Sequence, residues 1–215
     1  MKIEPLRKLA GREEIDYAFL LSALSEYARP REKISAWLKS GDLVRVKKGL
    51  YVFGPNVALA PYSSAVLANL IYGPSAISLQ YALAFYGFIP ERVTTVTSIT
   101  NKRNKNFTTP VGDFIYHYLN PRKYPLGITL MNASEQQPFL IATPEKALCD
   151  VIYLTCEKNT LTTLHEVETF LLYDLRIEGT ALQSLQVSSL MAISKLYADK
   201  KLVLLTQFIK HWKKK

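Results

Sequence analysis

Cysteine is scarce in this sequence, with only Cys149 and Cys156 among 215 residues. Both fall in a segment whose apolar residues recur at helical spacing, so their separation of seven positions corresponds to roughly 10 Å along a helix axis. That separation is too large for a disulfide bond. We therefore expect two free core thiols and a protein of a reducing compartment.

Long apolar runs are also missing. The first residues, Met1 to Pro5, lack the apolar stretch of a signal peptide, and no later run approaches the ~20 residues of a transmembrane helix. Apolar residues nevertheless make up 48% of the chain and charged residues 21%, which is typical of a folded protein. We expect a cytoplasmic protein that makes no use of a membrane.

The short motifs of common catalytic and cofactor sites are absent too. The sequence contains no glycine-rich phosphate loop and no nucleophile elbow. Its three histidines are scattered, and none forms a cluster at metal-ligand spacing: His117, His165 and His211. We expect no metal, no cofactor and no enzymatic activity.

One enzymatic alternative stays open. Asp113, Glu145 and Lys146 have the residue types of a nuclease-like site, an acidic pair with a lysine. Because adjacent residues of a helix point in different directions, Glu145 and Lys146 do not converge as alternating strand residues do. A helix-capping role for Glu145 explains the same residues more simply.

What the sequence does have is positive charge, +9 in total, and this charge is segregated. Residues 29–48 carry seven basic and two acidic side chains, residues 92–123 six and one, and residues 200–215 six and none. Residues 135–178 reverse the sign, with eight acidic and three basic side chains. This segregation favours a polyanionic partner on one surface, although charge alone leaves an ordinary solvated surface open.

The first basic block coincides with two predicted helices. Asp16 is placed to cap a helix in which apolar residues recur at helical spacing as far as Tyr27. A second helix begins at Pro30 or Arg31 and runs to Ser40, where Gly41 ends it. We expect Trp37 to lie in the core beneath the second helix.

A basic hairpin follows these helices. Two β-prone runs, Leu43 to Val46 and Leu50 to Phe53, enclose the turn Lys47-Lys48-Gly49. Two helices and a basic hairpin are the plan of a winged helix-turn-helix. A helix fits the major groove of B-DNA, and a basic hairpin tip beside it suits the phosphates, so we expect positioning and sequence reading to be divided between them.

The candidate DNA-binding residues lie on the outer face of the second helix, in the hairpin, and in a basic loop from Asn101 to Asn106 between two expected strands. They are Arg29, Arg31, Ser35, Lys39, Arg45, Lys47, Lys48, Lys102, Arg103 and Lys105. We expect Arg31, Lys39 and Lys47 to converge on one surface. The alternative for the second helix and for the loop is an exposed polar face without a partner.

The rest of the chain predicts a larger α+β domain. Gly54 to Pro61 is typical of a linker, which divides the chain into a winged-helix domain of residues 1–57 and a second domain of residues 58–215. Two short helices, capped by Ser63 or Ser64 and by Ser78, precede a mainly antiparallel sheet. The expected strands are Val93–Thr100, Phe114–Leu119, Ile128–Met131 and Phe139–Ala142; the expected C-terminal helices begin at Thr143 and cover residues 163–173, 188–199 and 201–212.

Several of these segments resemble one known family. They are Leu43 to Val52 (LVRVKKGLYV), Tyr72-Gly73-Pro74, Ile77-Ser78-Leu79 with Ala82-Leu83, Tyr86 to Glu91 (YGFIPE), and Ile141 to Asp150 (IATPEKALCD). In order and spacing they resemble the AbiEi family of antitoxins from type IV toxin-antitoxin systems, which act in abortive infection, a phage defence. The resemblance covers roughly residues 16–155, and its DNA-contacting module corresponds to Arg31 to Lys39 and Arg45 to Lys48.

The resemblance implies a winged-helix transcriptional repressor that binds double-stranded DNA at its own promoter. It also implies a neighbouring gene for a nucleotidyltransferase-type toxin whose effect the protein counteracts. Two other classes of function stay open. One is a protein-binding module that neutralises a partner directly through the acidic segment of residues 135–178, with no specific DNA target; the other is an enzyme acting on nucleic acid through Asp113 or Glu145.

Overall fold

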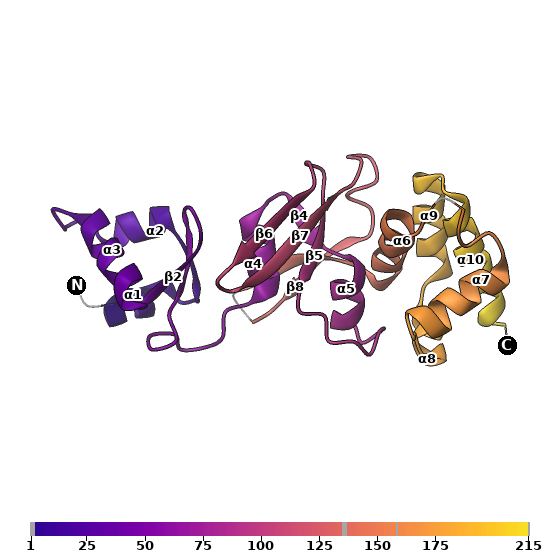
Figure 1. Ribbon diagram of the computed structural model, residues 1–215, viewed down its shortest axis with the longest axis horizontal. Helices are drawn as coiled ribbons and strands as arrows, with labels where there is room; N and C mark the ends of the chain where they lie inside the picture. Colours follow the sequence, from indigo (N-terminus) through magenta and orange to yellow (C-terminus); the bar gives the residue numbers. More distant parts are fainter. Residues whose placement is uncertain (1–2, 135–136, 158, 215) are drawn as a thin grey trace.

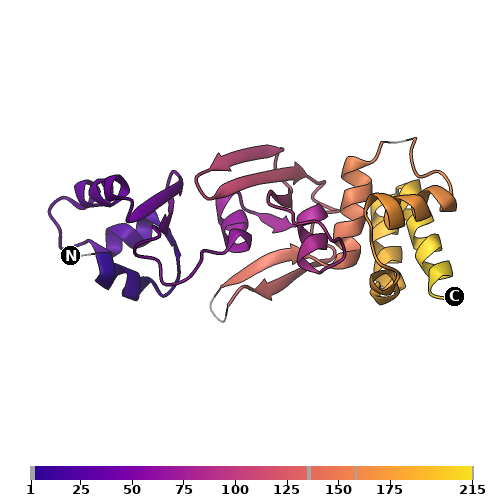
Figure 2. The ribbon, with the colours of Figure 1, turned by 60° about the horizontal axis from the view of Figure 1, so that its bottom comes forward.

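The protein is mixed α+β, as the sequence predicts. The computed structural model describes residues 3–134, 137–157 and 159–214. Along its long axis the chain passes from an N-terminal lobe through a central sheet to a group of C-terminal helices (Figures 1 and 2). Within the described ranges, no helix has both the length and the apolar character that a membrane span requires.

The N-terminal lobe consists of three helices and a small sheet. In chain order these are α1 (Ile3–Ala10), β1 (Glu14–Asp16), α2 (Tyr17–Ala23), α3 (Pro30–Ser40), β2 (Leu43–Lys47) and β3 (Leu50–Phe53). The strands form an antiparallel sheet in the order β1-β3-β2. The predicted helix signals are confirmed: Asp16 accepts a hydrogen bond from the Phe19 amide at 2.7 Å, and Gly41 ends α3 with a left-handed φ of 78°. The first predicted helix is shorter than expected and ends at Ala23.

Strand β3 is buried on both faces. Tyr51 and Phe53 belong to the core of the N-terminal lobe, together with Ile34 and Trp37 of α3. Leu50 and Val52 belong to the larger core that continues into the rest of the molecule. Because side chains alternate along a strand, β3 turns two residues toward each core. Both of its faces are therefore buried, which explains why all four residues are apolar.

Two buried glutamates of the N-terminal lobe hold the segment that leads to the central sheet. Glu13 forms an ion pair with Arg7 and accepts hydrogen bonds from the amides of Leu59 and Ala60 at 3.1 and 2.8 Å. Glu14 accepts from the Ser63 amide at 2.6 Å and from Gln137 at 2.9 Å. The segment between β3 and α4 is therefore fixed to the lobe before it.

The central sheet has six strands in the order β6-β7-β5-β4-β9-β8. They are β4 (Ser75–Ile77), β5 (Val96–Thr100), β6 (Lys105–Thr109), β7 (Gly112–Tyr118), β8 (Ile128–Asn132) and β9 (Pro138–Ala142). The four predicted strands are present, and the sheet is mixed. Three of its five strand pairings are antiparallel, as predicted, whereas β5 pairs with β7 and β4 with β9 in parallel. Strand β6 takes the antiparallel place beside β7 that the sequence predicts for β5.

Helices cover the sheet and complete the chain. They are α4 (Ser64–Ile71), α5 (Leu79–Phe85), α6 (Pro144–Thr155), α7 (Leu164–Thr169), a π-helical turn η1 (Phe170–Asp174), α8 (Gly179–Ser184), α9 (Val187–Tyr197) and α10 (Lys200–Trp212). The predicted caps Ser63 and Thr143 accept the expected amide hydrogen bonds. Ser78 precedes α5 as predicted, but its side chain does not cap the helix and donates instead to Asp150.

Candidate nucleic-acid interface

Three of the basic residues predicted to bind DNA line one cleft of the N-terminal lobe. Arg31 lies in the first turn of α3, Arg45 on β2, and Lys48 in the turn between β2 and β3. Together with Tyr17, Gly49 and Tyr51 they surround a cleft of about 870 Å³. All three cations are exposed, and within the described parts of the chain no carboxylate lies at ion-pair distance from any of them. Their charge is therefore available to a ligand.

Local sequence explains how the cleft forms. Pro30 starts α3 and places Arg31 at its N-terminal end, where backbone N–H groups also point outward. Gly49 has a φ of 86°, which allows the tight turn that carries Lys48. The Arg45 guanidinium lies 6.0 Å from the ring centre of its cross-strand partner Tyr51 and forms a cation–π contact with it. The arrangement suits an anion held between a helix and a hairpin.

Lys47 does not join this cleft, contrary to the expected convergence of Arg31, Lys39 and Lys47. The register shifts between Arg45 and Lys47, and the Lys47 ammonium donates to the carbonyl of Ile71 at the end of α4. Burial, and secondarily the charge of Lys102, lowers the pKa of Lys47. Lys47 therefore connects the hairpin to the central sheet domain rather than facing outward with its neighbour Lys48.

Lys102 lies beside Lys47 at the same helix end. Its ammonium donates to the Gly73 carbonyl at 2.5 Å and lies 5.5 Å from the ring centre of Tyr72. The C-terminal end of a helix carries unsatisfied carbonyls and partial negative charge, which attracts cations. These contacts bring the loop after β5 next to the hairpin of the N-terminal lobe.

The other predicted residues are exposed and lie outside the cleft. Arg29 forms a solvent-exposed ion pair with Glu32 at 3.2 Å. Ser35 and Lys39 are exposed on α3, and Arg103 is exposed in the loop before β6. Lys105 is the first residue of β6 rather than part of a loop, and its ammonium lies 5.7 Å from the ring centre of Phe107.

Sequence reasoning missed the aromatic part of the cleft. The sequence pattern assigns Tyr17 only to the apolar face of its helix, and Tyr51 only to a β-prone run. One signal in the sequence could have placed Tyr51 beside the cations. A short turn fixes which residues lie opposite each other, so the hairpin pairs Tyr51 with Arg45. The shift of register at the bulge next to Lys47 hides that signal in the sequence.

The residues of the enzymatic alternative have separate surroundings. Asp113 is exposed at the start of β7, opposite Thr108. Glu145 is buried and accepts a hydrogen bond at 2.8 Å from the amide of Gln186, which precedes α9. Glu145 therefore caps another helix rather than its own, and no contact joins it to Asp113 among the described residues.

Lys146 is part of a fully buried polar network. Its ammonium lies 2.9 Å from the Asp150 carboxylate and also contacts the hydroxyl of Tyr197 in α9. Asp150 in turn accepts from Ser78 at 2.6 Å and from Tyr197. Burial lowers the pKa of Lys146, an effect that the negative charge of Asp150 opposes. The network joins the central sheet to the C-terminal helices and has no opening to solvent, because Lys146, Asp150 and Ser78 are all fully buried.

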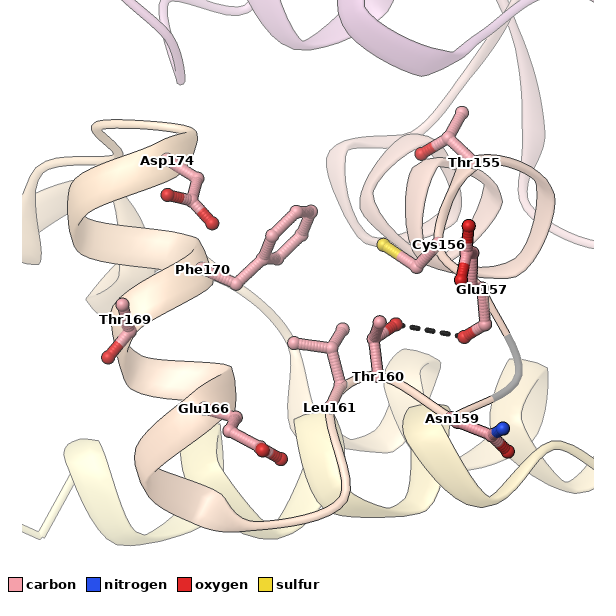
Figure 3. A pocket seen from close by; sticks show the side chains of 10 residues that line it. All are labelled: Thr155, Cys156, Glu157, Asn159, Thr160, Leu161, Glu166, Thr169, Phe170 and Asp174. Atoms are coloured by element: carbon pink, nitrogen blue, oxygen red, sulfur yellow. Dashed lines mark hydrogen bonds between the residues drawn. The ribbon is translucent and has the colours of Figure 1, made fainter.

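The acidic segment does not present all its carboxylates on a surface, since Glu145 and Asp150 are buried. Glu157, Glu166 and Asp174 line a cavity of about 520 Å³ between the end of α6 and the α7-η1 segment (Figure 3). Phe170 and Cys156 point toward each other across it (Figure 3). Both cysteines are free, as predicted, and burial raises the pKa of the Cys156 thiol.

Comparison with protein-family models and with curated proteins found no match. In the described ranges, no group of three or more His, Cys, Asp or Glu side chains is arranged to hold a metal ion.

Proposed function

We propose that this protein is a sequence-specific DNA-binding repressor with an N-terminal winged helix. The order α1-β1-α2-α3-β2-β3 with sheet order β1-β3-β2 supports the winged helix, in which α3 is the recognition helix and the β2-β3 turn is the wing. The single observation that carries the proposal is the cleft where Arg31, Arg45 and Lys48 meet without carboxylate partners. A phosphate of the DNA backbone binds there, between the helix and the wing.

The loop after β5 extends this surface. Contacts of Lys47 and Lys102 with the end of α4 place the loop next to the wing, and Arg103 and Lys105 in that region are exposed. Arg103 and Lys105 bind phosphates further along the duplex. Lys47 and Lys102 position the wing and the loop and contribute charge at longer range.

The decisive measurement is the salt dependence of DNA binding by the full chain. The probes are a duplex from the region upstream of the protein's own coding sequence and an unrelated duplex of equal length. Replacing Arg31, Arg45 and Lys48 together by alanine lowers the slope of log affinity against log salt by roughly 0.9 for each phosphate that is no longer neutralised. Both duplexes are affected, because phosphate contacts carry no sequence information.

The matched control replaces Lys195, Lys200 and Lys210 by alanine, three exposed lysines of the C-terminal helices. This control changes the net charge equally, so a general charge effect would lower both slopes alike. An unchanged slope in the Arg31, Arg45 and Lys48 variant would remove the cleft from the interface.

We further propose that the repressor is the antitoxin of a type IV toxin-antitoxin system, on the basis of its resemblance to the AbiEi family. In that role it represses its own promoter and counteracts a nucleotidyltransferase-type toxin from a neighbouring gene. Expression of that gene with and without this protein tests the role by growth. Growth arrest that this protein does not relieve would contradict the antitoxin role and leave the DNA-binding proposal standing.

A further inference from the structure

The outer surface of the C-terminal helices carries an apolar groove of about 470 Å³ between α9 and α10. Met191 is 56% exposed and Val203 47% exposed, both large fractions for apolar side chains that lie within one lobe. On α10 the lining residues follow helical spacing, at positions 203, 206, 207 and 210. The opposite face of α10, with Leu202, Leu205 and Ile209, is buried in the core. One side of this helix thus packs into the core, and the other side exposes apolar surface.

Two exposed lysines stand at opposite ends of the groove. Lys195 lies three residues before Ala198, whose left-handed conformation turns the chain from α9 into α10. Lys210 lies in the last turn of α10. Val203 and Lys210 are seven positions apart, which corresponds to roughly 10 Å along the helix. No acidic side chain lines the groove, and neither lysine has an ion-pair partner within the described residues.

We propose that this groove binds an acidic amphipathic helix of a partner protein. Apolar residues of the partner, spaced at i, i+3, i+4 and i+7, fill the space over Met191 and Val203. Two carboxylates about two turns apart on the partner then meet Lys195 and Lys210, because the lining residues Val203 and Lys210 lie about two helical turns apart on α10. Methionine suits such a surface, since its flexible side chain adapts to different apolar partners.

Charge argues against the other occupants. A second copy of the chain docked on this face would bring lysines against lysines, because residues 200–215 carry six basic and no acidic side chains. A nucleic-acid backbone would contact the two lysines but leave the exposed apolar side chains of Met191 and Val203 uncovered, whereas an amphipathic helix buries them. An acidic amphipathic helix matches both the apolar lining and the charged ends.

The test uses the full chain and a labelled synthetic peptide of about 18 residues, long enough to form a helix. Leucine occupies the apolar positions, and two glutamates seven residues apart lie at the edge of this apolar face. A second peptide has lysine in place of both glutamates. Fluorescence anisotropy measures binding as a function of salt. We expect the acidic peptide to bind more tightly than the basic one, with affinity that falls as salt rises.

Lys195→Glu with Lys210→Glu lowers the affinity for the acidic peptide at least about tenfold, because like charges then face each other at both ends. Met191→Asp also weakens binding of both peptides, since it places a charge on the apolar surface. The matched control is Lys8→Glu with Lys200→Glu, two exposed lysines outside the groove. This pair changes the net charge equally and leaves peptide affinity within about twofold of the original.

Three outcomes overturn the proposal. One is equal affinity for both peptides, or an affinity for the acidic peptide that is the same in the original protein and in the Lys195 and Lys210 variant. A second is a dimer in sedimentation that Met191→Asp dissociates, which would make the groove an interface between copies. The third is a loss of DNA affinity in the Lys195 and Lys210 variant without peptide binding, which would assign this face to nucleic acid. None of these outcomes depends on the proposed cleft at Arg31, Arg45 and Lys48.

Discussion

The cleft of the N-terminal lobe and the buried network around Lys146 use the same kinds of side chain in opposite ways. Lys48 in the cleft is exposed and has no carboxylate partner in the described chain, whereas Lys146 is fully buried and lies 2.9 Å from Asp150. A buried ammonium must be paired, and its charge is then committed to the fold. An exposed, unpaired one keeps its charge for a partner. A count of basic residues in the sequence therefore overestimates the charge that can bind a partner, because it includes residues such as Lys146 that are paired inside the fold.

The strongest test of this contrast is Asp150→Ala. The substitution leaves the Lys146 ammonium buried without its counter-charge and removes the acceptor for Ser78 and Tyr197. We expect the free energy of unfolding to fall by about 3–5 kcal/mol, measured by urea denaturation. Lys48→Ala is the control from the cleft and changes stability by less than about 0.5 kcal/mol. Equal effects of the two variants would erase the distinction between the regions.

Two glycines sharpen the same comparison. Gly127 has a φ of 79°, and a Cβ there would lie 2.8 Å from the Cβ of Lys146. Gly49, in the turn between β2 and β3, has a φ of 86°, but no atom of the described residues beyond its chain neighbours lies within 4 Å of its Cβ position. Gly127→Ala therefore combines backbone strain with a clash in the core, and we expect a loss of about 2–4 kcal/mol. Gly49→Ala causes backbone strain alone, so we expect its free energy of unfolding to fall by about 1 kcal/mol in the same urea denaturation measurement. A smaller loss at Gly127 than at Gly49 would contradict this account.

In the β2-β3 hairpin, Lys47 and Lys48 differ as the two regions do. On the proposed function, we expect Lys48→Ala to lower the salt slope of DNA binding by about one and to leave stability nearly unchanged. Lys47→Ala removes the hydrogen bond to the Ile71 carbonyl, so we expect a loss of about 1 kcal/mol in stability and a smaller change of slope. The two variants are compared in the same DNA titration and the same unfolding measurement. Identical slopes for both would show that the two lysines share one role.

Glu166 offers an exposed charge that is nevertheless committed to the fold. Its carboxylate accepts from the Thr162 amide and hydroxyl and from the Thr163 amide, and the hydrogen bonds from Thr162 hold the pKa of Glu166 below its ordinary value. Because the folded pKa is depressed, this stabilisation is complete above the unfolded pKa and disappears as pH falls through the folded one. Glu166→Gln should lower the thermal midpoint slightly at pH 7, and the difference from the original protein should vanish at low pH. A difference that persists in acid would contradict this sign.

Local signals allowed several helix boundaries to be predicted, most of them in the N-terminal lobe. Asp16, Pro30, Gly41 and Thr143 each act on the backbone within a few residues, so their effect is visible in the sequence alone. Helix α1 was not predicted, because its eight residues include Pro5 and only a short apolar pattern. The parallel pairing of β5 with β7 was missed because strand β6, which lies between them in the chain, was not predicted; its first two residues, Lys105 and Asn106, were assigned to the basic loop.

The candidate site was predictable in its composition but not in its geometry. Arg31, Arg45 and Lys48 were correctly grouped with the N-terminal module, since basic residues cluster there in the sequence. The roles of Lys47, Lys102 and Ser78 depend on partners that are 24, 29 and 72 positions away. Contacts over such separations arise from the packing of whole elements, which a local pattern does not encode.

Strand β3 has a consequence for any attempt to isolate the N-terminal lobe. Its outer row, Leu50 and Val52, together with Val46 of β2, would face water if the chain were cut after residue 58. A fragment of this kind would present a strip of apolar side chains on a two-sided sheet, a surface prone to aggregation. The lobe is thus not an independent module: grafted onto another protein, it would need another apolar surface to cover Leu50 and Val52.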